Sequence, residues 1–311
     1  MKRILFAASE CVPFIKTGGL ADVCGALPKE FSKEEWDVRV VIPNYSCIPE
    51  KFRNQFQYVT HFYMCAGNYI QNKYVGILKY ELDGVTYYFI DNQEYFTCDT
   101  PYGDIRYDIE KFVFFDKAVL SMLKQIDFRP DLIHCHDWET GLIPVYLKNE
   151  FQADSFYWGM KSIITIHNLK FQGVWDVKTM KGLTGFSADL FAPDKLEFHK
   201  DANMLKGGLV YADYITTVSD SYAQEIQTDY YGEGLPVTFL RCRVLASKSF
   251  EEAADLVKNL KRCISNNVVL VGKKGQVLDF EVQPYKMDQV YSQGGILTHA
   301  NHFVVDPDAD A

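Results

Sequence analysis

The chain has 311 residues, of which 48% are hydrophobic and 23% charged, the balance of an ordinary globular protein. Its 41 acidic and 32 basic side chains give a formal net charge of −9, which excludes a general attraction to nucleic acid or anionic lipid. The apolar start is too short for a signal peptide, and no apolar run approaches the roughly 20 residues that span a bilayer. We therefore expect a cytoplasmic protein with no nucleic-acid or membrane partner.

The first two thirds of the chain alternate short β-branched runs with helical patterns, beginning at the N-terminus. The predicted strands are residues 3–8, 37–42, 131–135, 162–166 and 214–218. The predicted helices are residues 20–31, 110–126, 139–149 and 220–227. A hairpin is predicted at Asp83-Gly84. Strands separated by helices of this length predict an α/β fold, a Rossmann-type parallel sheet with helices on both faces and ligands at the strands' carboxyl ends.

The pattern changes after about residue 234. A capping box at Ser249–Glu252 predicts a helix that runs to about residue 262. Residues 267–272 and 276–282 then read as two antiparallel strands, and 296–299 as a further strand. We therefore expect two domains, an α/β domain over residues 1–235 and a small α+β part over residues 236–311.

The eight cysteines are scattered and form no Cys-x-x-Cys pair, as expected of free thiols. A metal site would depend on His134, Cys135, His136 and Asp137. Alternate residues of a strand point to opposite faces, so these four cannot converge on one ion, and a second ligand group is missing. We expect no metal site.

One candidate ligand-binding loop, residues 9–23 (SECVPFIKTGGLADV), joins the first strand to the first helix. Gly18 and Gly19 allow a close backbone approach, and the amides at the helix start point toward a bound anion. Lys16 could add a positive charge for a diphosphate. The alternative is an ordinary strand-to-helix turn with a solvated lysine, and the spacing alone does not choose between the two.

Two further clusters, residues 134–141 and 165–173, also follow predicted strands. Asp137 could bind sugar hydroxyls while Trp138 covers an apolar sugar face, or Asp137 could cap the helix with Trp138 in the core. His167 could stabilise charge on a reacting sugar or be a buried core histidine. Because three successive strands end in polar groups, a shared crevice at the sheet edge is the favoured interpretation.

Long segments of residues 1–235 resemble the N-terminal half of bacterial glycogen (starch) synthase, among them ILFAASECVPFIKTGGLADVCGALPK, HCHDWETGLIPVYLK, TIHNLKFQGVW and YAQEIQTDYYGEGL. The resemblance implies a two-domain retaining glucosyltransferase that transfers glucose from ADP-glucose to an α-1,4-glucan such as glycogen, with no metal and no cofactor. The implied catalytic residues are His167, Asp137 and Asn168. The implied substrate-binding residues are Lys16, Gly18, Gly19, Asp22, Glu10 and Trp138.

The tail resembles a different family, the penicillin acyltransferase-like Ntn hydrolases, through NNVVLVGKKGQVLDFE and THANHF. That family uses an N-terminal cysteine, whereas Cys242 and Cys263 are interior and lack the free α-amine that would act as base. Asn301 matches a polar position near that family's oxyanion site. The sequence therefore reads as a chimera joined near residues 232–237.

Two alternatives to the glucosyltransferase remain open from the sequence. One is a non-catalytic sugar- or nucleotide-binding remnant of a fused or truncated gene, and the other is an acyltransferase- or amidase-like hydrolase based on the tail. The resemblance places most of the nucleotide contacts in a second domain that this sequence does not contain. We therefore expect negligible transfer activity from this chain by itself.

Overall fold

The computed structural model describes residues 1–226, 249–259, 266–271, 277–282 and 287–291. It divides into two compact units, Met1–Asp220 (the N-terminal unit) and Ser221–Ala311 (the tail unit), and each is considered by itself. The predicted domain boundary at residue 235 lies outside the described residues and stays a prediction. Among the helices that are described, none is long and apolar enough to cross a bilayer.

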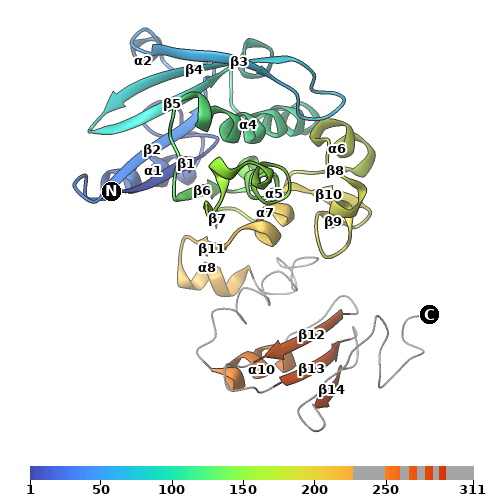
Figure 1. Cartoon of the computed structure of the whole chain (residues 1–311). Coiled ribbons are helices and arrows are strands. Elements are labelled where there is room, and N and C mark those ends of the chain that lie inside the picture. Colours follow the sequence, from blue (N-terminus) through green and yellow to red (C-terminus); the bar gives the residue numbers. More distant parts are fainter. Residues whose placement is uncertain (227–248, 260–265, 272–276, 283–286, 292–311) are drawn as a thin grey trace. The chain divides into compact units, whose positions relative to one another are not determined.

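An eight-stranded sheet forms the centre of the N-terminal unit, in the order β11-β7-β6-β1-β2-β5-β4-β3 (Figure 1). Its strands are β1 (Lys2–Ala7), β2 (Trp36–Pro43), β3 (Gln57–Met64), β4 (Lys73–Leu82), β5 (Val85–Asp91), β6 (Leu132–His136), β7 (Lys161–Ile166) and β11 (Tyr214–Thr217). The pairs from β11 to β5 are parallel, and β4 and β3 extend the sheet in antiparallel pairing. The predicted Rossmann-type parallel sheet is confirmed, with an antiparallel extension at one edge.

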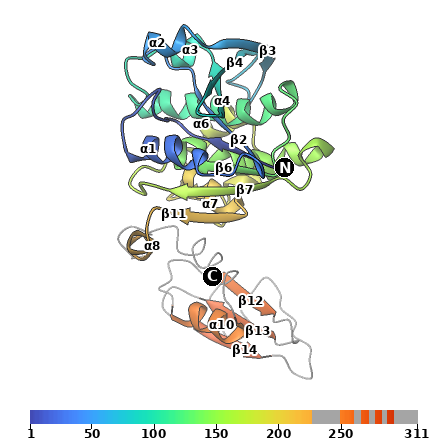
Figure 2. The same ribbon diagram turned by 90° about the vertical axis from the view of Figure 1, so that its left-hand side faces the viewer.

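The position of a strand within the sheet explains how apolar its sequence is. β1 lies between β2 and β6, and its residues from Ile4 to Ala7 are at most 3% exposed, as expected of a strand covered on both faces. The predicted hairpin is also present, because β4 and β5 are joined by Asp83 and Gly84, both at positive φ (52° and 74°). Figure 2 shows β7 and β11 side by side at the opposite end of the sheet from this hairpin.

Helices connect the strands of the N-terminal unit. They are α1 (Gly19–Ala26), α2 (Glu50–Arg53), α3 (Gln93–Phe96), α4 (Ile105–Gln125), α5 (Leu142–Asn149), α6 (Val177–Thr184) and α7 (Met204–Tyr211). A further helix, α8 (Asp220–Glu225), begins at the last residue of this unit and otherwise belongs to the tail unit. The connection through α1 leads from β1 to β2, toward the β3 edge of the sheet. The connections through α4, α5 and α7 lead to β6, β7 and β11, toward the opposite edge. Because such crossovers are right-handed, α1 lies on the face opposite to α4, α5 and α7.

Two helix ends differ from the sequence prediction for local reasons. The first helix ends at Ala26 and continues as a 3-10 turn over Leu27–Lys29, because Pro28 has no N–H to extend the α-helical pattern. The helix predicted from residue 110 begins five residues earlier, because Asp104 accepts a hydrogen bond from the Arg106 N–H at 2.9 Å and caps it. A small sheet of β8 (Val174–Asp176), β9 (Glu197–Phe198) and β10 (Asp201–Asn203) was not predicted.

The tail unit contains the predicted helix and hairpin strands. Its described elements are α10 (Phe250–Asn259), β12 (Asn266–Val271), β13 (Val277–Val282) and β14 (Met287–Tyr291). Ser249 caps α10, since its Oγ accepts the Glu252 N–H at 3.0 Å. The strands pair antiparallel in the order β12-β13-β14, and β14 was not predicted. The strand predicted at residues 296–299 lies outside the described residues.

Close packing of α5 and α7 depends on glycine at the start of α5. A Cβ on Gly141 would lie 2.4 Å from the Met204 carbonyl oxygen, and a Cβ on Gly208 would lie 2.9 Å from the Gly141 carbonyl oxygen. We expect Gly141→Ala to lower the free energy of unfolding by about 1–3 kcal/mol, because backbone must move to admit the methyl group. Urea unfolding followed by tryptophan fluorescence measures this, since all four tryptophans lie in the N-terminal unit.

The matched control is Gly19→Ala, because a Cβ at Gly19 would meet nothing within 4 Å. We expect this variant to be as stable as the wild type or slightly more stable. Equal stability of the Gly141→Ala and wild-type proteins would contradict the packing argument.

Candidate functional site

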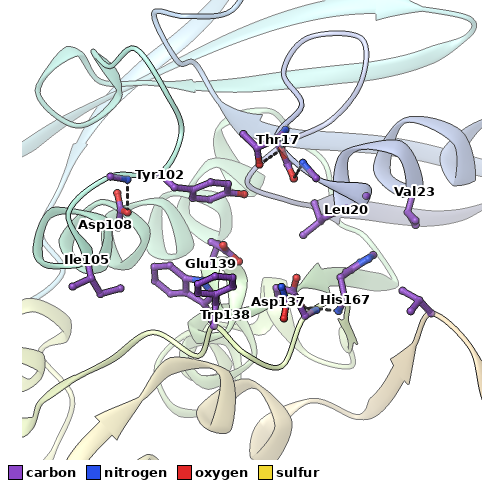
Figure 3. Close-up of a pocket in the computed structure, with 17 residues that line it drawn as sticks. Thr17, Leu20, Val23, Tyr102, Ile105, Asp108, Asp137, Trp138, Glu139 and His167 are labelled. Atoms are coloured by element: carbon purple, nitrogen blue, oxygen red, sulfur yellow. Dashed lines mark hydrogen bonds between the residues drawn. The ribbon is translucent and has the colours of Figure 1, made fainter. Parts of the chain in front are cut away.

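A pocket of about 800 Å³ opens at the carboxyl ends of β1, β6 and β7, the edge predicted from the sequence (Figure 3). Its walls come from the loop after β1, the start of α1, the segment before α4, and the loops after β6 and β7. The lining residues are Glu10, Thr17, Gly18, Gly19, Leu20, Val23, Tyr102, Gly103, Ile105, Asp108, Asp137, Trp138, Glu139, His167, Asn168, Phe171 and Val218. Seven of the nine predicted site residues are therefore brought together, and Lys16 and Asp22 are not among them.

Glu10 shapes the loop that leads into α1. Its side chain is only 2% exposed, and its carboxylate accepts hydrogen bonds from the Thr17 N–H, from Thr17 Oγ1 at 2.8 Å and from the Gly18 N–H at 3.2 Å. These bonds fold the loop back over the end of β1. α1 begins at Gly19 with no side-chain cap on its first amides, which leaves that helix start on the pocket wall available to an anion.

Lys16 and Asp22 form an ion pair beside the pocket. Lys16 Nζ lies 2.7 Å and 2.8 Å from the two Asp22 oxygens, and the two side chains are 52% and 55% exposed. An ion pair this exposed contributes little to stability, about 0–1 kcal/mol. Lys16 can therefore exchange Asp22 for another anion at small cost, and its contact with a ligand stays a prediction.

Asp137 joins the ends of β6 and β7. Its Oδ1 accepts the His167 N–H at 2.7 Å and the Asn168 N–H at 3.3 Å, and its own N–H donates to the Thr165 carbonyl at 3.0 Å. Its backbone angles, a φ of 56° and a ψ of −165°, are ones that residues other than glycine rarely adopt. Burial raises the pKa of Asp137 to about 7, against the lowering effect of these two hydrogen bonds. The alternative that Asp137 caps the next helix is wrong, since its side chain makes no cap hydrogen bond.

Trp138 and Glu139 form the floor of the pocket and lie below Tyr102 in Figure 3. Trp138 is 4% exposed and packs edge-to-face on Phe112 at 5.2 Å, so it belongs both to the core and to the pocket wall. Glu139 Oε2 is buried and has no hydrogen-bond partner in the described part of the chain. Burial raises the pKa of Glu139 well above its ordinary value, because the buried site disfavours the charged form.

Three histidine rings are in contact at the pocket: His134 stacks on His136, and His136 contacts His167 at a tilted angle. The rings of His134 and His136 lie 4.3 Å apart, and His136 Nδ1 lies 2.9 Å from Nε2 of His167, which lines the pocket. Burial lowers the pKa of His134 and of His167 to about 4, and burial together with the neighbouring imidazoles places the pKa of His136 well below its ordinary value. All three rings are therefore neutral at pH 7. Within the described residues, no cluster of His, Cys, Asp or Glu is arranged to hold a metal ion.

Sequence reasoning missed the wall formed by the segment before α4. Tyr102 lies with its hydroxyl 2.7 Å from Ser9 Oγ, and Asp108 accepts the Gly103 N–H at 2.8 Å and pairs with Lys111 at 2.6 Å. The turn residues that start this segment, from Pro101 to Asp104, were the available signal for a loop there. No local pattern showed that the loop meets the ends of β1 and β6.

The neutral state of His134 has a consequence for acid stability. Between about pH 6.5 and pH 4 the unfolded chain protonates this histidine and the folded chain does not, so the free energy of unfolding falls as the pH falls. One such group contributes about 1.4 kcal/mol per pH unit. We expect His134→Gln to lose less stability than the wild type over this range, by about 2 kcal/mol between pH 6.5 and pH 4.5.

Urea unfolding at a series of pH values, followed by tryptophan fluorescence, measures this difference. Above about pH 7.5 the histidine is neutral in both states, so the stability difference between the two proteins should be constant there. Parallel pH profiles below pH 6.5 would show that His134 is not held neutral by the fold.

Asp137 provides a second test of the site. Asp137→Ala leaves the N–H groups of His167 and Asn168 without their acceptor, so we expect the free energy of unfolding to fall by about 1–3 kcal/mol. Asp137→Asn retains an acceptor oxygen and a residue type that tolerates positive φ, and should stay near wild-type stability. Equal loss in both variants, measured by urea unfolding, would show that the carboxylate's hydrogen bonds are not what stabilises this edge.

The tail of the chain is similar to a second family. Residues 223–309 match the family described as acyl-coenzyme A:6-aminopenicillanic acid acyl-transferase, in agreement with the resemblance stated for the tail. This match overlaps by residues 223–239 with the match of the preceding part of the chain, which runs over residues 3–239.

The N-terminal unit is similar to several named proteins. Glycogen synthase of Lachnoclostridium phytofermentans is 59% identical over 235 residues, which cover 76% of this chain and 49% of the relative. Glycogen synthase of Clostridium botulinum (strain Alaska E43) is 49% identical over 234 residues, 75% of this chain and 48% of the relative. The catalytic domain of Arabidopsis thaliana starch synthase IV, solved bound to ADP and acarbose, superposes with a TM-score of 0.66 at 27% identity, over 76% of this chain and 48% of that one.

The chain thus spans about half the length of the curated relatives it matches. Residues 3–239, more than half of the chain, match the family described as the starch synthase catalytic domain, and the resemblance stated for this part is confirmed. The chain belongs to the starch synthase catalytic domain family.

Proposed function

We propose that the N-terminal unit binds ADP-glucose, and that it serves the transfer of glucose from this donor to an α-1,4-glucan in glycogen biosynthesis, in the cytoplasm. Support comes from the 59% identity to a glycogen synthase and from the likeness to a starch synthase domain solved with ADP and acarbose. The donor is a substrate, and the proposal involves neither a metal ion nor a cofactor. On this proposal the chain is a hexosyltransferase of the starch synthase type.

The observation that carries the proposal is the composition of one pocket. The start of α1 at Gly19 shares it with Asp137, His167 and Asn168. Free amides at a helix start suit a diphosphate, because they donate hydrogen bonds and lie at the positive end of the helix dipole. Carboxyl, imidazole and carboxamide groups suit the hydroxyls of a sugar. A nucleoside diphosphate sugar combines these two chemistries in one molecule.

Glucosyl transfer breaks the bond between the anomeric carbon and the diphosphate, and forms a bond from that carbon to the oxygen of a glucan hydroxyl. The O–H bond of that hydroxyl breaks, and its proton goes to the departing diphosphate. As the first of these bonds breaks, negative charge develops on the departing diphosphate, which is where the start of α1 and the ammonium group of Lys16 would act. His167 is neutral at pH 7, so its contribution is a hydrogen bond and not a positive charge. Trp138 would cover an apolar face of the sugar from the pocket floor.

Lys16→Ala tests the donor site. A charge-assisted contact between an ammonium group and a diphosphate is worth about 1–3 kcal/mol, so we expect the affinity for ADP-glucose to fall by about 5- to 150-fold. Isothermal titration calorimetry on the full chain measures it. Lys29→Ala is a matched control, because Lys29 is also a lysine in an exposed ion pair, with Asp83 at 2.8 Å, and does not line the pocket.

Unchanged affinity in Lys16→Ala, or an equal loss in Lys29→Ala, would refute the assignment of Lys16 to the diphosphate. The alternatives that the sequence left open are separated by adding glycogen and labelled ADP-glucose to the same protein. Binding of the donor without transfer favours a non-catalytic sugar-nucleotide-binding remnant. Absence of donor binding in the wild type refutes the proposed function itself.

A further inference from the structure

A buried histidine outside the pocket wall contacts one inside it. His136 is the last residue of β6, is fully buried and does not line the pocket. Its Nδ1 lies 2.9 Å from Nε2 of His167, a normal hydrogen-bond distance between two nitrogens. The predicted site included His167 and not His136, and nothing in the proposed function uses His136.

The His136 ring is held in a fixed position. It stacks on Phe6 at 5.9 Å with an interplanar angle of 18°, and on His134 at 4.3 Å with an angle of 25°. Thr140 fixes the backbone on both sides: its Oγ1 accepts the His136 N–H at 2.6 Å and its hydroxyl donates to the His136 carbonyl at 2.9 Å. Because stacking holds the ring and Thr140 holds the backbone, it is Nδ1 of His136 that faces His167.

Because both rings are neutral at pH 7, a single proton lies between the two nitrogens. In one arrangement His136 donates from Nδ1, and His167 then carries its own proton on Nδ1. In the other arrangement His167 donates from Nε2, and His136 then carries its own proton on Nε2.

The surroundings of His136 distinguish the two arrangements. Its Nε2 is buried and, among the residues that the structure describes, has no hydrogen-bond partner. The second arrangement would therefore bury an N–H group with nothing to accept it, which proteins avoid more strictly than a bare acceptor. We infer that His136 is a positioning residue that donates its Nδ1 proton to His167 and thereby holds His167 as the Nδ1–H tautomer.

This tautomer decides what His167 offers to a ligand. In the described part of the chain, the hydrogen bonds of His167 are those of its backbone N–H with Asp137 and of its Nε2 with His136. The Nδ1–H group on the other side of the ring is left to donate to an acceptor oxygen in the pocket. That the oxygen belongs to the glucose of the donor rests on the proposed function, whereas the tautomer does not.

The tautomer is measured directly by long-range proton–nitrogen NMR on the full chain labelled with ¹⁵N-histidine, at pH 7 and without ligand. The signals of His167 are assigned by their loss in His167→Gln. We expect a bare Nε2 and a protonated Nδ1 at His167 in the wild type. A protonated Nε2 at His167 would overturn the inference, whatever the protein binds.

Two substitutions test the role of His136. His136→Asn places a carboxamide N–H near the position of Nδ1 and should keep His167 in the Nδ1–H form. His136→Phe keeps a ring for stacking on Phe6 but has no donor, so we expect the Nδ1–H population of His167 to fall by at least half. A single Nδ1–H form in His136→Phe would overturn the role of His136, and if that variant does not fold, the wild-type and His136→Asn spectra still decide.

His134→Gln is the matched control, because His134 stacks on the same ring but hydrogen-bonds to Thr165 Oγ1, at 2.6 Å, and not to His167. We expect the His167 tautomer to be unchanged in it; a change as large as in His136→Phe would assign the effect to packing and overturn the inference.

Addition of ADP-glucose then separates the proposed function from the inference about the tautomer. Failure of the donor to shift the His167 signals counts against the proposed function and leaves the tautomer as measured, whereas loss of the Nδ1–H form in the free wild type counts against His136 alone.

Discussion

The hydrogen bonds of Asp137 are the interaction on which the rest of the site depends. Through its backbone N–H and its side-chain Oδ1, this residue connects the end of β6 to Thr165, His167 and Asn168 at and beyond the end of β7. They also explain how a non-glycine residue is held at a φ of 56°, because three hydrogen bonds, to two amides and one carbonyl, fix its backbone and side chain together. With that turn in place, the imidazole of His167 and the indole of Trp138 reach the same pocket.

Around this turn, burial favours the neutral form of several titratable groups. Burial lowers the pKa values of His134, His136 and His167 and raises that of Glu139, which favours the neutral form of each group. The exposed ion pair of Lys16 and Asp22 lies outside the lining. Burial makes an isolated charge costly in the interior, whereas an exposed charge costs little. His167 therefore presents an uncharged ring to the pocket, whereas the charged Lys16 lies beside it.

Much of this arrangement could be predicted from short-range patterns. The apolar runs located the central strands, Asp83-Gly84 located the hairpin, and Ser249 located the start of α10, because each signal lies within a few residues of its effect. The wall that contains Tyr102 could not be found in this way. It meets Ser9 because the chain from β5 to β6 passes back over β2 and β1 before β6 pairs with β1. The contact therefore depends on the order of strands across the whole sheet.

The contact between His136 and His167 shows the same limit at atomic scale. The sequence argument that residues 134–137 cannot converge on one ion rests on alternation along a strand, and alternation is also what stacks His134 on His136. The partner across the sheet is set by register, with His136 opposite Thr165, so that the loop after β7 returns His167 to the same face. A register one residue different would turn both rings of β6 to the other face and leave His167 without a donor. Local residue patterns identify candidate groups, but the protonation of a candidate is decided by a neighbour that only the paired sheet supplies.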